Sequence, residues 1–191
     1  MLKILVCVKQ VPDVNLVKID PVTGSLIRKG VPAILNPLDA NALEAAVQVK
    51  ERYGGEITCI TMGPDQAMEA LRVCLAAGSD RAVLLSDRAF ANADTLATSY
   101  VIVTAAKMLG EFDLVFCGKE SLDGATGQMG AQLAERFDAS QISSMSRIIG
   151  IDEAAKTVTA ERELERGIEV CEAKYPCLLT VEKTNYRPRI P

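Results

Sequence analysis

Short apolar runs rich in Val, Ile and Leu recur along the chain and are separated by longer stretches with helical spacing. The runs are ILVCV at 4–8, ITCITM at 57–62, AVLLS at 82–86 and DLVFC at 113–117. Near-continuous apolar strands that alternate with helices are typical of a parallel sheet covered on both faces. The pattern therefore predicts an α/β fold, with a doubly wound, mostly parallel sheet and helices on both of its faces.

The helices between these runs begin and end at residues with strong capping preferences. They are predicted at 36–53, 65–78, 94–110 and 127–137. Asn36, Asp65 and Asp94 stand where a helix N-cap is expected, and glycines follow the predicted ends of the first three helices. Pro37 directly after Asn36 suits the first helical turn.

Two segments depart from the strand–helix alternation. VKIDPVTGSLIRKG at 17–30 predicts a hairpin excursion near the N-terminus, with VKID and SLIR as short strands around Pro21 to Gly24. After about residue 140 the helical period disappears, and 156–183 predicts a C-terminal pair of antiparallel strands with Arg166-Gly167 near their turn, followed by a buried strand CLLTV. We expect one domain over 1–183. The terminal 184–191, TNYRPRIP, is too rich in proline and arginine to form a core and is expected to be an extended arm.

Composition excludes several classes of function. The 191 residues include no histidine, which removes Ser-His-Asp and Cys-His nucleophilic sites and most transition-metal sites. The six cysteines show no C-x-x-C spacing, so neither a disulfide framework nor a zinc site is implied. A net charge of −4, the absence of tryptophan and the lack of a basic block argue against nucleic acid.

Location and partners follow from the same features. No apolar run is long enough to insert into a membrane. The N-terminal MLKILVCVK is interpreted as a first strand rather than a signal peptide, so a cytoplasmic location is expected. A small molecule and another protein are the expected partners.

The candidate binding chemistry lies in the loop GKESLDGATGQMG at 118–130. Ligands of open α/β sheets bind outside the carboxyl ends of the strands, where this loop would meet VKQVPD at 8–13 and TMGPDQ at 61–66. Gly124, Gly127 and Gly130 let the chain turn tightly and bring backbone N–H groups close to an anion at a helix N-terminus. Thr126 could cap that helix or hold a phosphate oxygen. The order of residues is neither that of a Walker A loop nor that of the dinucleotide-binding G-x-G-x-x-G.

Packing explains the same residues about as well. Gly127, Gly130, Ala131 and Ala134 could form a helix face lying close against the sheet, and the sequence leaves this open against phosphate binding. For Asn36, Cys7 and Met62 the structural role is favoured, whereas the role of Asp123 is left open. Asn36 would be a helix cap, Asp123 a turn residue or a ribose partner, and Cys7 and Met62 core residues.

Five segments in order resemble the β subunit of electron transfer flavoprotein across essentially the whole chain. They are LVCVKQVPD, VKIDPVTGSLIRKGVPAILNPLDANALEAA, TMGPDQAMEALRVCLAAGSDRAVLLSDRAFANADT, DLVFCGKESLDGATGQMGAQLAE and VTAERELERGIEVCEAKYPCLLTVE. The likeness is strongest to the anaerobic bacterial branch. It implies a non-enzymatic electron-carrier subunit that forms a heterodimer with an FAD-holding α subunit and accepts electrons from flavin dehydrogenases.

The resemblance also implies a nucleotide site in this chain, holding AMP or, in electron-bifurcating members, a second FAD. Carried over residue by residue, the site would use Cys7, Lys9, Asn36, Pro37, Leu38, Asp39, Met62, Gly63, Gly118, Lys119, Ser121, Asp123, Gly124, Ala125, Thr126, Gly127 and Gln128. By the same resemblance, Val14, Asn15 and Leu16 would lie near the flavin of the α subunit.

Two features depart from the family pattern. Ala125 stands in DGAT where bifurcating members usually carry a second acidic residue, and AMP-binding members carry a longer acidic and Asn-containing loop. The resemblance therefore does not decide between AMP and FAD. Family members also continue past RPRIP into a dehydrogenase-docking loop and a helical arm, so either the chain is truncated or it lacks that loop. A universal-stress-type ATP-binding module is the alternative function. An ATP-pyrophosphatase-like enzyme would need S-G-G-x-D-S after the first strand, where this chain has KQVPDV.

Overall fold

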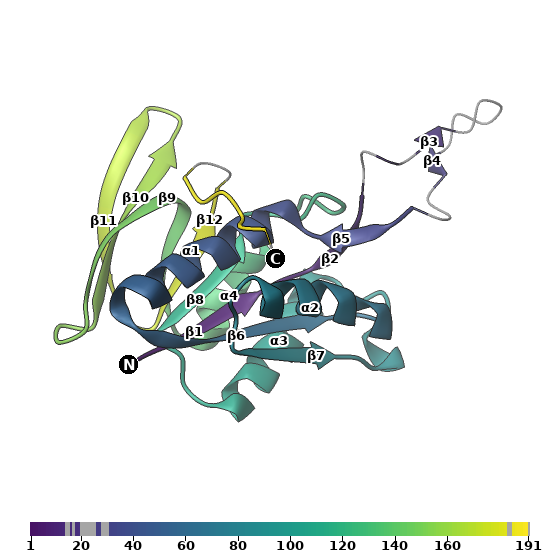
Figure 1. Cartoon of the computed structure of the whole chain (residues 1–191), viewed down its shortest axis with the longest axis horizontal. Coiled ribbons are helices and arrows are strands. Elements are labelled where there is room, and N and C mark those ends of the chain that lie inside the picture. Colours follow the sequence, from purple (N-terminus) through teal and green to yellow (C-terminus); the bar gives the residue numbers. More distant parts are fainter. Residues whose placement is uncertain (14–15, 17, 20–25, 28–30, 183–184, 191) are drawn as a thin grey trace.

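An eight-stranded sheet forms the centre of the protein, with the strand order β11-β10-β9-β12-β8-β1-β6-β7 (Figure 1). The structure is a computed structural model and describes residues 1–13, 16, 18–19, 26–27, 31–182 and 185–190. The strands of the sheet are β1 (Leu2–Cys7), β6 (Gly55–Met62), β7 (Arg81–Leu85), β8 (Leu114–Gly118), β9 (Ser140–Asp152), β10 (Thr157–Leu164), β11 (Gly167–Lys174) and β12 (Cys177–Val181).

Helices cover both faces of this sheet, as the apolar pattern predicts. On one face lie α1 (Pro37–Tyr53) and α2 (Met68–Ala76), and on the other lie α3 (Thr95–Leu109) and α4 (Met129–Phe137). Side chains alternate along β1, so that Ile4 and Val6 pack with the first pair of helices while Leu5 and Cys7 pack with the second. Burial on both faces is the reason that these strands are apolar throughout.

The order of the parallel strands creates a switch point between β1 and β8. From β1 the chain moves outward through β6 to β7 and then returns to the other side of β1 as β8, followed by β12. The two central strands run parallel in register from Ile4–Leu114 to Cys7–Cys117. In sheets of this type, a crevice opens at the carboxyl ends of the two strands where the order reverses.

The C-terminal strands confirm the predicted antiparallel pair and add a strand. β10 and β11 pair antiparallel, and the turn between them lies at 165–166. The long β9, which the sequence did not predict, joins this pair to the parallel sheet because it runs parallel to β12 and antiparallel to β10. Register shifts interrupt both pairings, so buried positions along β9 do not alternate and the period-2 signal is lost.

The predicted N-terminal hairpin is present. β3 (Lys18–Ile19) pairs antiparallel with β4 (Leu26–Ile27), and β2 (Gln10–Pro12) pairs with β5 (Ala33–Leu35) nearer the sheet. The turn predicted at Pro21 to Gly24 lies outside the described residues. In Figure 1 these short strands form an arm that projects from the body of the protein.

The predicted helix caps have mixed outcomes. The Asp94 carboxylate accepts a hydrogen bond from the Ala97 N–H at 2.8 Å, which confirms its capping role. The prediction for Asp65 is wrong, because a short 3-10 turn precedes α2 and the Asp65 carboxylate accepts from Ser86 Oγ at 2.9 Å instead. α4 begins at Met129, two residues after the predicted start.

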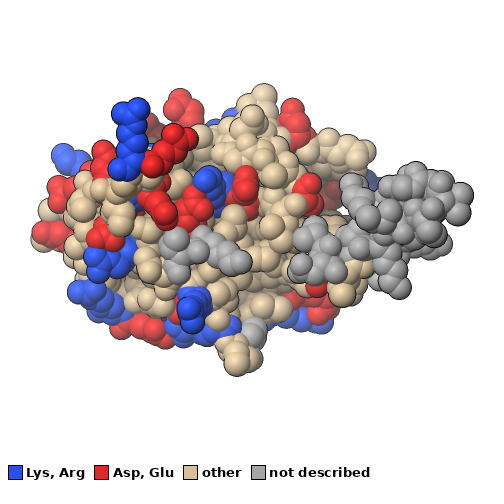
Figure 2. All heavy atoms as spheres, turned by 90° about the horizontal axis from the view of Figure 1, so that it is seen from above, with Lys and Arg blue, Asp and Glu red and all other residues tan. Residues whose placement is uncertain are grey.

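The segment 185–190 is neither helix nor strand and runs beside α1 (Figure 1). It forms no core of its own, but Tyr186 is only 6% exposed and belongs to the core on the α1 side. The surface seen in Figure 2 carries basic and acidic side chains interspersed, without a large area of one sign. None of the helices in the described part of the chain combines the length and apolar character needed to cross a bilayer.

Candidate ligand-binding site

A cavity of about 270 Å³ lies at the switch point, where β1 and β8 end. Its walls come from the ends of β1, β6 and β8, the start of α1, the loop 118–128, the start of α3 and two residues of α4. The lining residues are Cys7, Val8, Lys9, Asn36, Asp39, Met62, Ala93, Asp94, Thr95, Thr98, Ile102, Cys117, Gly118, Lys119, Glu120, Ser121, Gly124, Thr126, Gly127, Met129 and Leu133.

Asp39 ties the two central strands together at the base of this cavity. Its carboxylate accepts hydrogen bonds from the Lys9 N–H at 2.8 Å and the Gly118 N–H at 2.9 Å. Burial raises the pKa of Asp39 to about 6, although both N–H groups stabilise the carboxylate and act against that rise. Asp39 therefore fixes the backbone at the strand ends and brings an ionisable group to the cavity.

Asn36 holds the glycine-rich loop rather than capping α1. It occupies the N-cap position, but its side chain makes no capping hydrogen bond. Instead Nδ2 donates to the Glu120 carbonyl at 2.9 Å, and Oδ1 accepts from the Leu122 N–H at 3.2 Å. The preference for a capping side chain is overridden because these buried amide groups satisfy the loop backbone.

Both lysines of the site are ion-paired. Lys9 Nζ lies 2.8 Å from both carboxylate oxygens of Asp123, and Lys119 Nζ lies 2.7 Å from Glu182 Oε1. Burial alone would raise the pKa of Asp123, but the hydrogen bonds from Lys9 and Ser121 hold it below its ordinary value. The Lys9–Asp123 pair joins the end of β1 to the middle of the loop 118–128.

The start of α3 forms a wall of the cavity that was not expected from the sequence, and it lies beside the start of α4, which was expected there. Thr95 Oγ1 lies 3.3 Å from Gln128 Oε1, to which it donates, and it accepts from Gln132 Nε2 at 3.2 Å. The N–H groups of the first turn of a helix have no intrahelical partners, and the N-cap residue of α4, Gln128, makes no side-chain hydrogen bond to them. The sequence feature that could have indicated this wall is Asp94-Thr95. It starts the helix after β7, and the loop after a parallel strand lies at the same carboxyl edge of the sheet as the cavity.

The glycines of the loop have different roles. A Cβ on Gly118 would lie 2.7 Å from Asp39 Oδ1 and 2.8 Å from the Leu38 carbonyl carbon, so its absence permits close approach of α1 to β8. Gly130 lies against Thr180, which confirms the packing role considered for it, whereas Ala131 is exposed and takes no part in that face. Gly127 adopts a φ of +62° with open space around it.

Cys7 and Cys117 form the floor of the cavity beside Met62. Both thiols are buried and belong to the core as well as to the cavity wall. Burial raises the pKa of each thiol, and neighbouring Cys117 and Asp39 add to the rise at Cys7. The thiols are therefore neutral at physiological pH and provide an apolar surface rather than a nucleophile.

The cavity brings together most of the residues proposed from the sequence. Those that line it are Cys7, Lys9, Asn36, Asp39, Met62, Gly118, Lys119, Ser121, Gly124, Thr126 and Gly127, and those that do not are Pro37, Leu38, Gly63, Asp123, Ala125 and Gln128. Several of the second group support the wall: Leu38 packs at Gly118, Gly63 N–H bonds to the Leu85 carbonyl, and Ala125 N–H bonds to the Ser121 carbonyl. Val14 and Asn15 lie outside the described residues, and Leu16 is 53% exposed.

The arrangement suits a ligand with an apolar part and an anionic part. Thiols, Met62, Met129 and Leu133 line the interior, while the uncapped start of α4 offers backbone N–H groups and a positive dipole end. Ser121 and Thr126 add hydroxyl groups at the loop. A nucleotide, with a flat base and a phosphate, combines these two characters.

Comparison with known proteins gives consistent results over nearly all of the chain. The profile of the electron transfer flavoprotein domain matches residues 23–191. The electron transfer flavoprotein subunit beta of Thermoanaerobacterium thermosaccharolyticum is 48% identical over 190 residues, which cover 100% of this chain and 72% of the relative. The caffeyl-CoA reductase-Etf complex subunit CarD of Acetobacterium woodii is 51% identical over 189 residues, covering 98% of this chain and 71% of the relative.

A third relative is matched over a smaller share of its length. Protein FixA of Bradyrhizobium diazoefficiens is 46% identical over 186 residues, which cover 95% of this chain and 65% of FixA. The chain thus spans about two thirds of the length of the FixA proteins that it matches.

Proposed function

Since the chain belongs to the electron transfer flavoprotein family, as a relative of its β subunits, we propose that it is the small subunit of a heterodimeric electron carrier and holds an adenine nucleotide in the cavity between β1 and β8. The partner is an FAD-holding α subunit, and electrons come from flavin dehydrogenases. The subunit itself turns nothing over. Its location in the cytoplasm is part of the same proposal.

The cavity at the switch point is the observation that carries the nucleotide part of this proposal. It has an apolar floor, a glycine-containing loop with hydroxyl groups, and the uncapped start of α4 on one side. Its volume of about 270 Å³ is slightly below the range of about 300–1,000 Å³ for small-molecule pockets. It would accommodate the AMP portion that AMP and FAD share, with the base against Cys7, Cys117 and Met62 and the phosphate at the start of α4.

The role of the protein is to place the nucleotide and to exclude water from one side of it. Bound flavin supplies one- and two-electron redox chemistry, while the protein supplies position and electrostatics. Asp39 holds the two strand ends at a fixed separation, and Asn36 holds the loop over the site. The arm formed by β2 to β5 projects from the body of the protein, and the approach of its residue Leu16 to the flavin of the α subunit is part of the proposal.

Counting cofactors in the complex tests the proposal. The chain is coexpressed with an electron transfer flavoprotein α subunit, the complex is purified, and acid-released flavin and AMP are counted per heterodimer by absorbance and mass spectrometry. One FAD and one AMP would support a simple carrier with a structural nucleotide. Two FAD would support a redox centre in this chain and electron bifurcation.

Two other outcomes would overturn the proposal. A chain that neither associates with the α subunit nor retains any adenine nucleotide would contradict both parts. A homodimer that retains ATP and no flavin would favour the universal-stress-type module. A variant with bulky residues at Gly124 and Gly127, described in the Discussion, assigns any retained nucleotide to this cavity rather than to the α subunit.

A further inference from the structure

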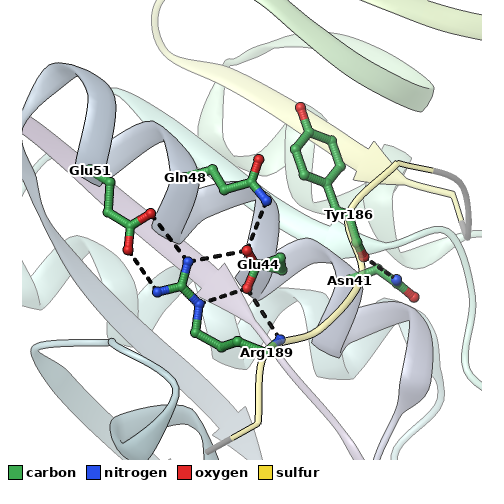
Figure 3. Close-up of polar contacts among 6 residues, drawn as sticks. All are labelled: Asn41, Glu44, Gln48, Glu51, Tyr186 and Arg189. Carbon is green, nitrogen blue, oxygen red and sulfur yellow. Dashed lines mark hydrogen bonds and ion pairs between the residues drawn. The ribbon is translucent and has the colours of Figure 1, made fainter.

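The segment 185–190 is fastened to α1 by a network of polar contacts (Figure 3). The Arg189 guanidinium contacts two carboxylates one above the other on α1. Its Nε lies 2.8 Å from Glu44 Oε2, and its Nη1 lies 2.7 Å from Glu51 Oε1. Nη2 also donates to both, at 3.1 Å to Glu44 Oε1 and 3.2 Å to Glu51 Oε2. The two glutamates are seven residues apart, and so lie on one side of the helix.

The same segment is also fastened to the sheet. The Tyr186 hydroxyl accepts a hydrogen bond from the Ile148 N–H at 2.8 Å, and Asn185 Nδ2 donates to the Ser146 carbonyl at 2.9 Å. Asn41 Nδ2 on α1 donates to the Tyr186 carbonyl. The segment therefore crosses from β9 to α1 and holds the two elements together, and the side of α1 that carries Asn41 and Glu44 is buried although it is polar.

The first turn of α1 carries cavity residues. Asp39, which bonds to the N–H groups of Lys9 and Gly118, precedes Glu44 by five residues, or about 7.5 Å along the helix axis. Asn36, which holds the loop 118–128, stands at the start of the same helix. A shift of α1 would move Asp39 and Asn36 together, because a helix of this length behaves as a rigid element.

From these contacts we infer that the segment 185–190 is a strap that positions α1 and thereby sets the shape of the cavity, with Arg189 as the positioning residue. Arg189 acts through α1 and does not itself line the cavity. That the ligand is an adenine nucleotide rests on the proposed function. The coupling of the strap, through α1, to the ends of β1 and β8 does not depend on it.

The two carboxylates of Glu44 and Glu51 favour an arginine at position 189 over a lysine. Burial alone would raise the pKa of Glu44, but the hydrogen bonds from Arg189 and Gln48 hold it below its ordinary value, so a buried carboxylate depends on this partner. A planar guanidinium donates paired hydrogen bonds to both carboxylates at once. A lysine ammonium keeps the positive charge but lacks this forked arrangement of donors. Arg189→Lys therefore loosens the strap without leaving Glu44 unpaired.

The experiment compares Arg189→Lys with Arg72→Lys in the full chain. Arg72 pairs with Glu69 on the exposed side of α2, where both side chains are 65% exposed, and it serves as the matched control. Hydrogen exchange of the Lys9 and Gly118 amides is measured without ligand, and AMP affinity is measured by calorimetry. In Arg189→Lys we expect both amides to exchange on the order of fivefold faster and AMP to bind about fivefold more weakly, as for other indirect couplings. Arg72→Lys should change neither.

The possible results distinguish a failure of the strap from a failure of AMP binding. Exchange at Lys9 and Gly118 that stays at the wild-type rate, while amides of 185–190 become faster, would overturn the strap as a positioning device. If wild-type protein binds no AMP but the two amides respond to Arg189→Lys, the strap is supported and AMP binding by this chain fails. Should Arg189→Lys not fold, Glu51→Gln removes only the exposed half of the fork and is measured in the same way. Unchanged exchange at both amides in that folded variant would overturn the inference.

Discussion

Replacing Gly118 by alanine tests the close approach of α1 to the end of β8. The new Cβ would lie 2.7 Å from both Asp39 Oδ1 and Leu38 Cβ, and 2.8 Å from the Leu38 carbonyl carbon. Contacts below 3 Å with backbone atoms cannot be relieved by rotating a side chain, so α1 or β8 must shift. The Asp39 hydrogen bond to the Gly118 N–H, now 2.9 Å, would lengthen with that shift.

The loss of stability in Gly118→Ala can be estimated from the usual cost of adding an atom to a packed site. One extra carbon forced into a packed site destabilises a protein by about 1–3 kcal/mol. We expect a loss of about 2 kcal/mol in the free energy of unfolding, which lowers Tm by about 4–8 °C for a chain of this length. Backbone strain makes no contribution, because Gly118 does not adopt a left-handed φ.

Urea unfolding followed by circular dichroism measures the loss, with Gly124→Ala as the control. The two glycines belong to the same loop, but a Cβ on Gly124 meets only Ser121 Oγ at 3.5 Å, an ordinary contact. The control should change the free energy of unfolding by less than about 0.5 kcal/mol. Equal losses in the two variants would refute the argument, because the effect would then follow from glycine itself rather than from the approach of α1.

Three further predictions concern the loop and the buried carboxylate. Gly124→Val with Gly127→Val should abolish nucleotide retention in the purified complex, because β-branched side chains would fill the space at the loop and Gly127 needs a φ of +62°; nucleotide at wild-type stoichiometry would show that the loop only packs. Asn36→Ala removes two hydrogen bonds to the loop and should cost about 1–3 kcal/mol, with faster proteolysis within 118–128; an unchanged cleavage rate would contradict its role. The pKa of Asp39 is raised from 3.8 to about 6 in the folded protein, so its contribution to stability is fully present below pH 3.8 and is lost as pH rises through 6. The unfolding free energy of wild type relative to Asp39→Asn should therefore fall by about 2.4 kcal/mol between pH 4 and 7, and a flat difference would show that Asp39 is already ionised in the fold at pH 4.

Local sequence signals were sufficient for the architecture. Continuous apolar runs predicted the buried parallel strands, the spacing between them predicted the helices, and the glycines after the first three predicted helices mark where those helices stop. These signals work because burial and backbone geometry act on neighbouring residues along the chain. Local signals failed at β9, where register shifts remove the alternation of buried positions, and at Asp65, whose carboxylate accepts a hydrogen bond from Ser86, just after β7.

The site was predictable in its location but not in its contacts. Rules for parallel sheets place ligands at the carboxyl ends of the strands, so the loop 118–130 could be identified from the chain alone. The role of Asn36 in holding this loop, instead of capping its helix, could not be predicted from the chain alone. It depends on which carbonyl and N–H groups the folded structure places near the Asn36 side chain. The start of α3 was missed for a related reason, since the contacts of Thr95 with Gln128 and Gln132 depend on how α3 packs beside α4.

The amino-acid sequence by itself determined the family, the doubly wound α/β class and the loop that lines the cavity. Only the tertiary structure decided which distant residues meet: Asp39 with the Gly118 N–H, Lys9 with Asp123, and Arg189 with Glu44. The physical reason is that a hydrogen bond or an ion pair depends on distances of about 3 Å between atoms. Periodicity fixes which face of an element is buried, but only the packing of whole elements brings such atoms within that range.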